Sequence, residues 1–533
     1  ADTKMRAVPP PGEEDLFWTI AMARILFGPD MSVQAPPNLN PGRLAALVEA
    51  GINDWGGVSP LTPDHVNPES PWPHLEQLAE ETSAAGKMLI ERLTIYPEYL
   101  RSASRWLDKQ VQPYVLRLVD AQGFGREDGW LSGQSEHVPS AWLDRPHGSA
   151  ASRRIATLLS RAEQGEILDV EDTERLFMAR GQDFHAVCDA ADRLRAGQCG
   201  DSVSYVVNRN INYTNICSFR CAFCAFAKGR KRTEASDAPY LKGPEEVARL
   251  AVEAWEGGAT EVCLQGGIHP SFTGETYLET LRAVRSAVPH IHIHAFSPLE
   301  VTHGARSLGL ALEDYLGMLA EAGLRTLPGT AAEILSDEVR DIICPDKITT
   351  SEGLNVMETA HGLGLKTTAT IMFGHVDRYR HWAVHLHHVL ELQRRTGGIT
   401  EFVPLPFVAE EAPIYRRGEA RRGPTFREAV LMHAVARLVL GRDISNIQTS
   451  WVKMGLEGAA FCLRAGCNDL GGTLMNESIT RAAGARHGQE MKPEILERTI
   501  LSCGREPRQR TTLYDFVDAT AAACSSPLIR SYG

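Results

Sequence analysis

Apolar residues recur in two alternating patterns from residue 203 onward. Short runs of β-branched and aliphatic residues, such as Val203–Asn212 and Glu261–Leu264, predict buried strands. Between these runs, apolar residues recur at spacings of three and four, as at Val247, Leu250 and Ala254, which predicts one face of a helix. Repeated strand–helix units predict an α/β protein with a parallel sheet, and their number favours a (β/α)8 barrel of the TIM type.

Four motifs stand directly after predicted strands of this barrel. They are the cysteine loop at 217–224, Gln265-Gly-Gly267, Pro328-Gly-Thr330 and Gly374-His375. Functional sites of such barrels lie at the C-terminal ends of the strands, where the following loops meet. We therefore expect these four motifs to share one site.

The cysteine loop carries the most specific chemistry. Cys217, Cys221 and Cys224 are separated by three and by two residues, and the next cysteine, Cys263, lies far outside the loop. A zinc site needs four ligands, usually as two close pairs, and a [4Fe–4S] cluster normally takes four cysteines. Three cysteines would leave one iron of a cluster open for a small molecule. A zinc site or a chance cluster of cysteines is the alternative, but the spacing, the preceding strand and Phe223 before the last cysteine favour an iron–sulfur cluster.

The stretch from about residue 150 to 490 resembles the tyrosine 4-hydroxyphenyl transferase half of FO synthase, in the radical S-adenosylmethionine (SAM) superfamily. The motifs that carry the resemblance, besides the cysteines, are Asn208-Arg-Asn-Ile-Asn-Tyr-Thr-Asn215, Cys224-Ala-Phe226, Leu264-Gln-Gly-Gly-Ile-His-Pro270, Pro328-Gly-Thr-Ala-Ala-Glu333 and Asn468-Asp-Leu-Gly-Gly472. The resemblance implies that the three cysteines bind a [4Fe–4S] cluster. It also implies that the amino and carboxylate groups of SAM fill the open iron site.

The resemblance also implies a set of residues that bind SAM. These are Gln265, Gly266, Gly267, Thr330, Glu333 and Phe373. The glycine-rich turn holds the methionine amino group, Thr330 and Glu333 contact the ribose, and Phe373 ends a predicted strand. Taken alone, the first motif also fits a simple tight turn, and Thr330 also fits the cap of a helix. No catalytic side chain is assigned.

The reaction implied by the resemblance is a radical group transfer. A reduced cluster cleaves SAM to a 5′-deoxyadenosyl radical, which takes a hydrogen atom from L-tyrosine. The 4-hydroxybenzyl fragment of tyrosine then adds to 5-amino-6-(D-ribitylamino)uracil, and the lyase half of FO synthase closes this product to FO, a deazaflavin. Two alternatives remain open: a menaquinone-pathway radical SAM enzyme with a different substrate, and a non-enzymatic zinc-binding module.

Two segments far apart in the chain resemble each other, residues 20–57 and 432–472. Ile20–Gly28 matches His433–Gly441 in its apolar pattern, and both segments end in a Gly-x-Asn-Asp-x-Gly-Gly turn. An offset of about 414 residues indicates duplication of a whole domain. Residues 1–110 therefore read as the C-terminal remnant of a first radical SAM barrel, similar to the tail of the lyase half. They contain no cysteine, so the lyase step is not expected from this chain alone.

The expected domains follow from these patterns. They are the barrel remnant at 1–110, a linker at 111–150, a helical extension at 151–200, the radical SAM barrel at 201–480 and a helical segment at 481–533. The chain begins at Ala1 rather than at Met, which indicates a processed or truncated product.

Composition and charge indicate which cellular compartment and which classes of partner to expect. Of the 533 residues, 43% are hydrophobic and 23% are charged, as in globular proteins. No apolar run is long enough to span a membrane, and the N-terminus has no signal-peptide core. Eleven cysteines are too sparse for a disulfide framework, which favours the reducing cytoplasm. The net charge of −12 argues against a nucleic-acid partner.

One short stretch after the cysteine loop is strongly basic. Lys228, Arg230, Lys231 and Arg232 are expected to help dock an acidic electron donor, a flavodoxin or ferredoxin. An ordinary solvated loop is the alternative.

Five histidines have uncertain roles in the sequence. His292 and His294 alternate on a predicted strand, so they share one face, which is either the site or the packed floor of the barrel. His381, His385 and His388 share one helical face, for which a solvated outer surface is favoured over a metal site.

Overall fold

The computed structural model describes residues 8–9, 11–143, 151–228 and 238–517. Arg230, Lys231 and Arg232 of the basic stretch lie outside these residues. The chain divides into two compact units, residues 1–101 with 123–125, and residues 102–122 with 126–533. Within the described residues, no helix has the length and apolar character needed to cross a membrane.

The larger unit is built on parallel strands, which form two sheets within the described residues. The first sheet has the order β2-β3-β4-β5-β6-β7, with strands β2 (Asn208–Asn212), β3 (Glu261–Gln265), β4 (His292–Ala295), β5 (Thr326–Leu327), β6 (Lys366–Phe373) and β7 (Ile399–Pro406). The second has the order β8-β1-β9, with strands β1 (Ser202–Val206), β8 (Asp469–Gly472) and β9 (Glu506–Gln509). All the neighbouring strands in both sheets are parallel.

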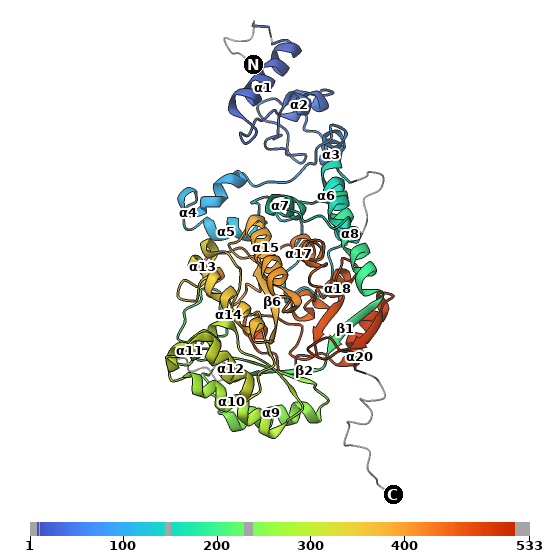
Figure 1. The fold of residues 1–533 in the computed structure, drawn as a ribbon. Helices are drawn as coiled ribbons and strands as arrows, with labels where there is room; N and C mark the ends of the chain where they lie inside the picture. The colour runs from blue at the N-terminus through green and yellow to red at the C-terminus, as the bar shows by residue number, and fades with distance from the viewer. Residues whose placement is uncertain (1–7, 10, 144–150, 229–237, 518–533) are drawn as a thin grey trace. The chain divides into compact units, whose positions relative to one another are not determined.

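The two sheets join into a barrel (Figure 1). Single parallel bridges from Phe402 to Ile447 and from Gln448 to Asp469 carry the pairing from β7 to β8. Strand β8 pairs with β1, which runs through Val207 into β2. Because the parallel pairings return to their starting strand, the predicted α/β barrel is confirmed.

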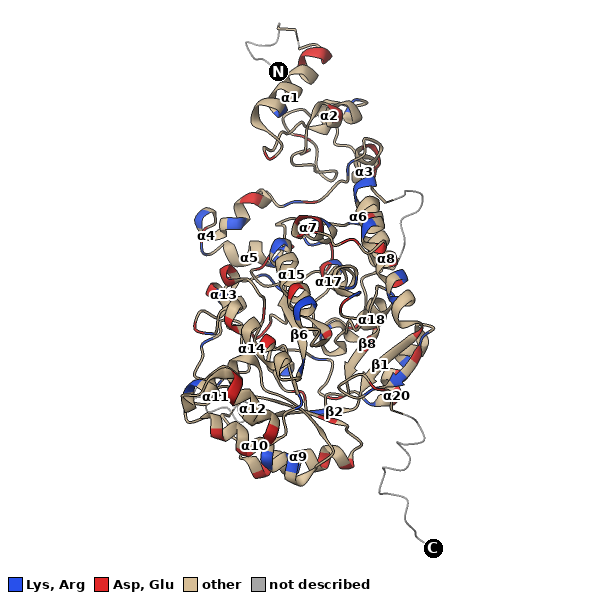
Figure 2. Cartoon of the chain, in the orientation of Figure 1, with Lys and Arg blue, Asp and Glu red and all other residues tan. Residues whose placement is uncertain are grey.

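Helices alternate with these strands. Those of the barrel and its C-terminal segment are α9 (Pro244–Glu256), α10 (Gly274–Ala287), α11 (Pro298–Leu308), α12 (Leu312–Ala322), α13 (Asp337–Ile343), α14 (Thr350–Gly362), α15 (Tyr379–Thr396), α16 (Pro413–Arg416), α17 (Phe426–Leu440), α18 (Trp451–Leu463), α19 (Ile479–Ala482) and α20 (Pro493–Ser502). Several begin at capping boxes, as at Thr349 with Glu352, in which each side chain satisfies a free backbone N–H of the first turn. Charged residues are frequent along helices such as α9 and α10 (Figure 2).

The helices before the barrel belong to the same unit. They are α4 (Ala103–Trp106), α5 (Gln112–Arg117), α6 (Arg153–Glu163), α7 (Val170–Phe177) and α8 (Gly181–Cys199). The last three lie within residues 151–200, for which a helical extension is expected. Residues 111–143 were predicted as a linker, yet they bury Val119, Trp130 and Trp142. At the other end, the segment predicted as helical also contributes strand β9, which pairs with β1.

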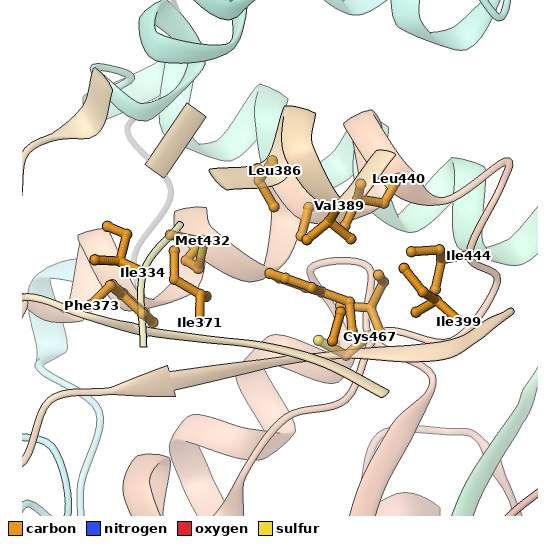
Figure 3. Packing of buried hydrophobic residues seen from close by; sticks show 14 of the residues in the cluster. Ile334, Ile371, Phe373, Leu386, Val389, Ile399, Met432, Leu440, Ile444 and Cys467 are labelled. Carbon is orange, nitrogen blue, oxygen red and sulfur yellow. The ribbon is translucent and has the colours of Figure 1, made fainter. Parts of the chain in front are cut away.

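Successive side chains of β6 point alternately into the apolar core and into the barrel interior. Ile371 and Phe373 point into an apolar layer that includes Leu386 of α15 (Figure 3). Thr370 and Met372 lie on the opposite side of the strand and line an interior cavity. The layer between the strands and the helices is therefore the packed core. The interior of the barrel remains free to form a site.

The histidine predictions are resolved by burial. His385 is fully buried in α15, which packs against α7 and α17, and its Nδ1 accepts a hydrogen bond from the Leu335 N–H at 2.9 Å. Burial lowers the pKa of His385 to about 3. The predicted solvated face is therefore wrong for His385, because its ring lies against the Leu335 N–H and the Phe402 ring of β7, 6.0 Å away between centroids. His292 and His294 both contact the Thr326 hydroxyl, at 2.8 and 2.7 Å, so they form part of the packed barrel floor.

The smaller unit contains three α-helices within its described residues, α1 (Glu13–Phe27), α2 (Leu44–Ala50) and α3 (Leu75–Ala84). Ile20, Leu47, Trp55 and Leu78 form its own apolar core. Its described residues include no regular strand, only isolated bridges such as the parallel one between 34 and 54. A partial second barrel in this unit stays a prediction.

Candidate cluster and cofactor site

A cavity of about 260 Å³ lies at the C-terminal ends of the barrel strands. The residues that line it include Cys217, Cys221, Cys224, Gln265, Gly266, Gly267, Thr330, Glu333, Lys347, Met372, Phe407 and Lys453. Eight of the nine residues predicted to bind the cluster or SAM are thus brought together, and the exception is Phe373. Its ring packs against Trp382 at 5.1 Å between centroids, and its neighbour Met372 takes the position that faces the cavity.

Backbone hydrogen bonds hold the cysteine loop against two neighbouring segments. The Ile268 N–H donates to Cys217 Sγ at 3.4 Å, and the Ser218 N–H donates to the Ile268 carbonyl at 2.8 Å. On the other side, the Ala222 N–H donates to the Ile343 carbonyl at the end of α13, at 2.7 Å. The loop is therefore positioned by the glycine-rich turn and by α13 together.

A cluster and a single ion place different demands on the spacing of the cysteine sulfurs. Within the described residues, no three ligand-type side chains stand close enough to hold one metal ion together. Zinc would need its thiolates at about 2.3 Å from one centre. In a [4Fe–4S] cluster each cysteine binds a different iron, so the three sulfurs stand further apart.

A buried ion pair lies beside the cysteines. Lys347 Nζ is 2.8 Å from Glu333 Oε1 and 5.4 Å from the centre of the Phe223 ring. Burial acts to lower the pKa of Lys347, but Glu333 and Cys221 outweigh it, and the pKa is raised. Burial raises the pKa of Cys221 and Cys224, so without iron these side chains are protonated thiols. Ligand binding to iron would replace those protons.

Close packing requires glycine at two positions of the 265–267 turn. A Cβ on Gly266 would overlap the Tyr213 ring, and one on Gly267 would overlap the Ile216 carbonyl oxygen. The turn is also held by Glu300, whose carboxylate accepts hydrogen bonds from the Tyr213 hydroxyl and from the Ser297 N–H at 2.7 Å. Burial raises the pKa of Glu300. Glu300 is a functional residue that the sequence did not reveal, since Ser297-x-x-Glu300 has only the pattern of a capping box.

Thr330 is the strongest sign of a bound ligand in this cavity. Its Oγ1 is shielded from solvent and has no hydrogen-bond partner in the described structure. The next helix, α13, begins only at Asp337, so Thr330 is not a helix cap. Glu333 has a positive φ of 52°, and its carbonyl accepts from the Met372 N–H at 2.6 Å. A buried hydroxyl without a partner is costly unless a ligand satisfies it.

Lys453 is a second functional candidate that sequence reasoning missed. It lies in the first turn of α18 and is half-buried where it lines the cavity, and its Nζ donates one long hydrogen bond, 3.4 Å, to the Thr480 hydroxyl. Burial lowers its pKa. The signal that could have found it is its position five residues after Gln448, at the end of a barrel strand.

Two family models match the barrel. The radical SAM superfamily model matches residues 211–389, and the model of the CofH/MqnC C-terminal region matches residues 396–523. The 5-amino-6-(D-ribitylamino)uracil–L-tyrosine 4-hydroxyphenyl transferase of Methanopyrus kandleri is 51% identical over 333 residues, which are 62% of this chain and 89% of that protein. The chain belongs to this radical SAM family. The resemblance inferred from the motifs is confirmed.

Longer relatives match almost the whole chain of this radical SAM protein. The FO synthase of Streptomyces coelicolor is 44% identical over 96% of the chain, and that of Mycobacterium tuberculosis strain H37Rv is 43% identical over 97%. The chain spans only 64% and 65% of the length of these two relatives.

Solved structures support the fold of this family. Methylornithine synthase PylB aligns with a TM-score of 0.52 at 18% identity, over 66% of this chain and 97% of that one. The hydrogenase maturase HydG from Carboxydothermus hydrogenoformans aligns with a TM-score of 0.52 at 14% identity, over 79% and 86%.

Radical SAM proteins use a [4Fe–4S] cluster and SAM, and these are the cofactors of the chain. The residues present fit both groups. Three cysteines share one cavity with a turn in which two glycines leave room for close backbone approach, and with the unsatisfied hydroxyl of Thr330.

Proposed function

We propose that the chain transfers the 4-hydroxybenzyl group of L-tyrosine to 5-amino-6-(D-ribitylamino)uracil, a step in the synthesis of the deazaflavin FO. The observation that carries this proposal is the 51% identity to the Methanopyrus kandleri transferase, which covers 89% of that enzyme. The cysteines and the glycine-rich turn at one barrel mouth agree with it. The alternative, a menaquinone-pathway enzyme, would use the same cofactors on a different substrate.

The proposed roles of the cavity residues follow from their positions. Cys217, Cys221 and Cys224 hold the cluster, and the 265–267 turn, with Thr330 and Glu333, holds SAM. When bound and reduced, these cofactors supply the radical that takes a hydrogen atom from tyrosine. The protein's own contribution is to orient the substrates and to exclude water, which Met372 and Phe407 assist by making part of the wall apolar.

We assign the tyrosine carboxylate to Lys453. The half-buried ammonium lines the cavity and donates only one long hydrogen bond, to a neutral hydroxyl, so a substrate carboxylate could give it a stronger acceptor. In this superfamily the carboxylate of SAM binds the open iron, which leaves the carboxylate of tyrosine in need of a cation. Lys347 is already paired with Glu333 in the described structure.

The proposed reaction is tested by anaerobic reconstitution with iron, sulfide, SAM, tyrosine and the pyrimidine. Mass spectrometry of the products should show the hydroxybenzyl adduct, and FO fluorescence should be absent until a lyase is added. SAM cleavage without any tyrosine-dependent product would refute the substrate assignment. FO formed by the chain alone would refute the view that it lacks the lyase step.

Replacing Lys453 with Met should raise KM for tyrosine by roughly 30-fold, as expected for the loss of a charged hydrogen bond of about 2 kcal/mol. SAM binding should be unchanged. Because burial lowers the pKa of Lys453, the wild-type KM should rise with pH at a lower pH than an ordinary lysine would require. The exposed Lys492 gives a control, since Lys492→Met should leave KM unaltered. An unchanged KM in the Lys453→Met protein would remove this residue from the substrate site.

We also propose that an acidic flavodoxin or ferredoxin delivers the electron, with Arg230, Lys231 and Arg232 at the docking surface. Lys228 is buried, so it is not part of an exposed patch. Changing the three residues to Ser should slow turnover with the protein donor several-fold and weaken its dependence on salt. Turnover with dithionite should stay the same, and an equal loss with both reductants would argue against docking.

We propose a cytoplasmic location because the described cysteines form no disulfide bonds. All ten cysteines in the described part of the chain are free, as expected in a reducing compartment.

A further inference from the structure

A segment in front of the barrel packs against the wall of the cofactor cavity. Residues 126–138, part of the predicted linker, belong to the same compact unit as the barrel. At one end, Arg126 Nη1 donates to the Gly423 carbonyl, just before α17, at 2.8 Å. At the other end, the Val138 N–H donates to Glu457 Oε2 of α18 at 3.1 Å. The segment is thus anchored to the barrel at both ends.

We call the middle of this segment, residues 131–135, the strap. It is a tight turn, in which the Ser135 N–H donates to the Leu131 carbonyl at 3.0 Å and the Leu131 N–H donates to Ser135 Oγ at 2.9 Å. Ser132 is 3% exposed, and its hydroxyl donates to the Phe407 carbonyl at 2.5 Å. Because Phe407 lines the cavity, the strap supports this part of the wall from behind.

Gly133 joins the strap to the residue proposed to bind the substrate. Its N–H donates to the Lys453 carbonyl at 2.6 Å, and its own carbonyl accepts from the Arg486 N–H at 2.7 Å. Gly133 has a φ of 76°, which favours glycine. A Cβ at this position would come within 3.1 Å of the Val408 and Ala485 side chains. A larger residue would therefore displace the strap from the wall.

The turn that carries Lys453 is separated from the rest of α18. Gly455 interrupts the helix with a φ of 69° and a ψ of 170°, a conformation that essentially only glycine adopts. A Cβ there would come within 3.1 Å of the Ser135 carbonyl oxygen and 3.3 Å of the His487 ring. The strap thus packs directly on the break, and the helix behind the break does not by itself fix the position of the first turn.

Besides the strap, two segments hold this first turn. His487 Nδ1 lies 3.0 Å from the Val452 carbonyl oxygen, and the Trp451 indole N–H donates to the Gly472 carbonyl of β8 at 2.9 Å. All these contacts fix the backbone, while the side chain of Lys453 lines the cavity. A binding group is precise only when its supporting contacts hold it to within about 0.5 Å. The position of the Lys453 ammonium therefore depends on these supports.

We propose that Ser132 and Gly133 of the strap are positioning residues that fix the Lys453 ammonium where the substrate carboxylate binds. The inference rests on the role proposed above for Lys453. The strap acts on the substrate side of the cavity, whereas the cysteine loop is held by contacts to Ile268 and Ile343. The segment predicted as a linker is thereby part of the substrate site.

The test measures binding of L-tyrosine to the full reconstituted chain with SAM but without a reductant, so that no radical forms. Isothermal titration calorimetry should give a roughly 5-fold higher Kd for Gly133→Ala, as expected for the loss of one hydrogen bond. Ser132→Ala adds no volume and should raise the Kd in the same direction, which covers the case that Gly133→Ala does not fold. SAM affinity and iron content should stay at wild-type values in both variants.

Gly129 gives a matched control in the same segment. It is exposed, and a Cβ there meets nothing within 4 Å. Gly129→Ala should therefore bind tyrosine with an unchanged Kd. A loss equal to that of Gly133→Ala would show that any change in the segment weakens binding, and would overturn the proposal.

A double variant separates positioning from a merely structural role. Gly133→Ala combined with Lys453→Met should bind tyrosine as Lys453→Met alone does, roughly 30-fold more weakly than the wild type, because the strap acts through Lys453. Independent effects would multiply to about 150-fold, and that result would overturn the proposal. An unchanged Kd in both strap variants would overturn it as well.

Hydrogen exchange separates the strap from the reaction. The amides of Lys453 and Met454 bond to the Ser450 carbonyl at 3.1 and 2.9 Å, and they should exchange faster in the Gly133→Ala protein. Unaltered exchange would refute the role of the strap whatever the substrate is. If the wild type does not bind tyrosine, the substrate assignment fails and exchange alone decides on the strap. Tyrosine binding without any adduct would refute the transfer reaction and leave the strap standing.

Discussion

Replacing Cys217, Cys221 or Cys224 with Ala should abolish SAM cleavage and leave little of the iron that a reconstituted chain binds. Each sulfur lines the same cavity, and each ligand of a cluster holds a different iron, so no neighbour can take over its role. The measurement is iron and sulfide per chain, expected to fall from about four of each to near zero, together with 5′-deoxyadenosine formed from SAM.

The matched control is Cys344, a buried cysteine near Cys221 that is not among the residues lining the cavity. Cys344→Ala should keep its iron and its cleavage activity. If a cysteine-loop variant retained both, or if Cys344→Ala lost both, the ligand assignment would be wrong.

Replacing Gly267 with Ala should have the second largest effect. The added methyl group would overlap the Ile216 carbonyl and come within 3.0 Å of Cys217 Cβ, and neither backbone nor ligand loop can give way without moving a cluster cysteine. We expect SAM to bind at least 10-fold more weakly, a loss of about 1.4 kcal/mol or more, and the cluster to be lost faster in air.

Gly197 offers a control for this change, because a Cβ there meets nothing within 4 Å and the residue lies inside helix α8. Gly197→Ala should therefore leave SAM affinity unchanged and stabilise the helix slightly. Full SAM affinity in the Gly267→Ala protein would show that the turn does not approach the cofactor.

Much of the site could be predicted from the sequence because a parallel barrel brings all C-terminal strand ends together. Once Cys224, Gln265 and Thr330 follow predicted strands, their meeting at one mouth requires no knowledge of loop geometry. The error at Phe373 has a different origin. Side chains alternate along a strand, so a shift of one residue exchanges the cavity face for the core, and the pattern of β6 alone does not say which face is which.

Other features depend on contacts between distant segments. His385 has the spacing of an outer helix face, but its ring meets Leu335 and Phe402, both of which lie outside this local pattern. Helix α7, more than two hundred residues before α15, covers the neighbouring His387. Lys453 stands alone among apolar neighbours, and a single lysine gives no motif. Glu300 has the pattern of a helix cap, and only the fold shows that its carboxylate also meets Tyr213. Local patterns therefore identified the cofactor loops better than the residues that surround them.

The pairing of β1 with the last described strand has a consequence for protein synthesis. Strand β1 begins at Ser202 and pairs with β9, which the ribosome adds about three hundred residues later. Until Arg510 emerges, Glu401 and Asp469 have no cation on this side, and burial raises the pKa of Glu401 to about 7 even with Arg510 in place. Contacts between such distant residues form slowly. A nascent chain that stops before residue 506 should thus leave β1 without its β9 neighbour and the two buried carboxylates without their cation.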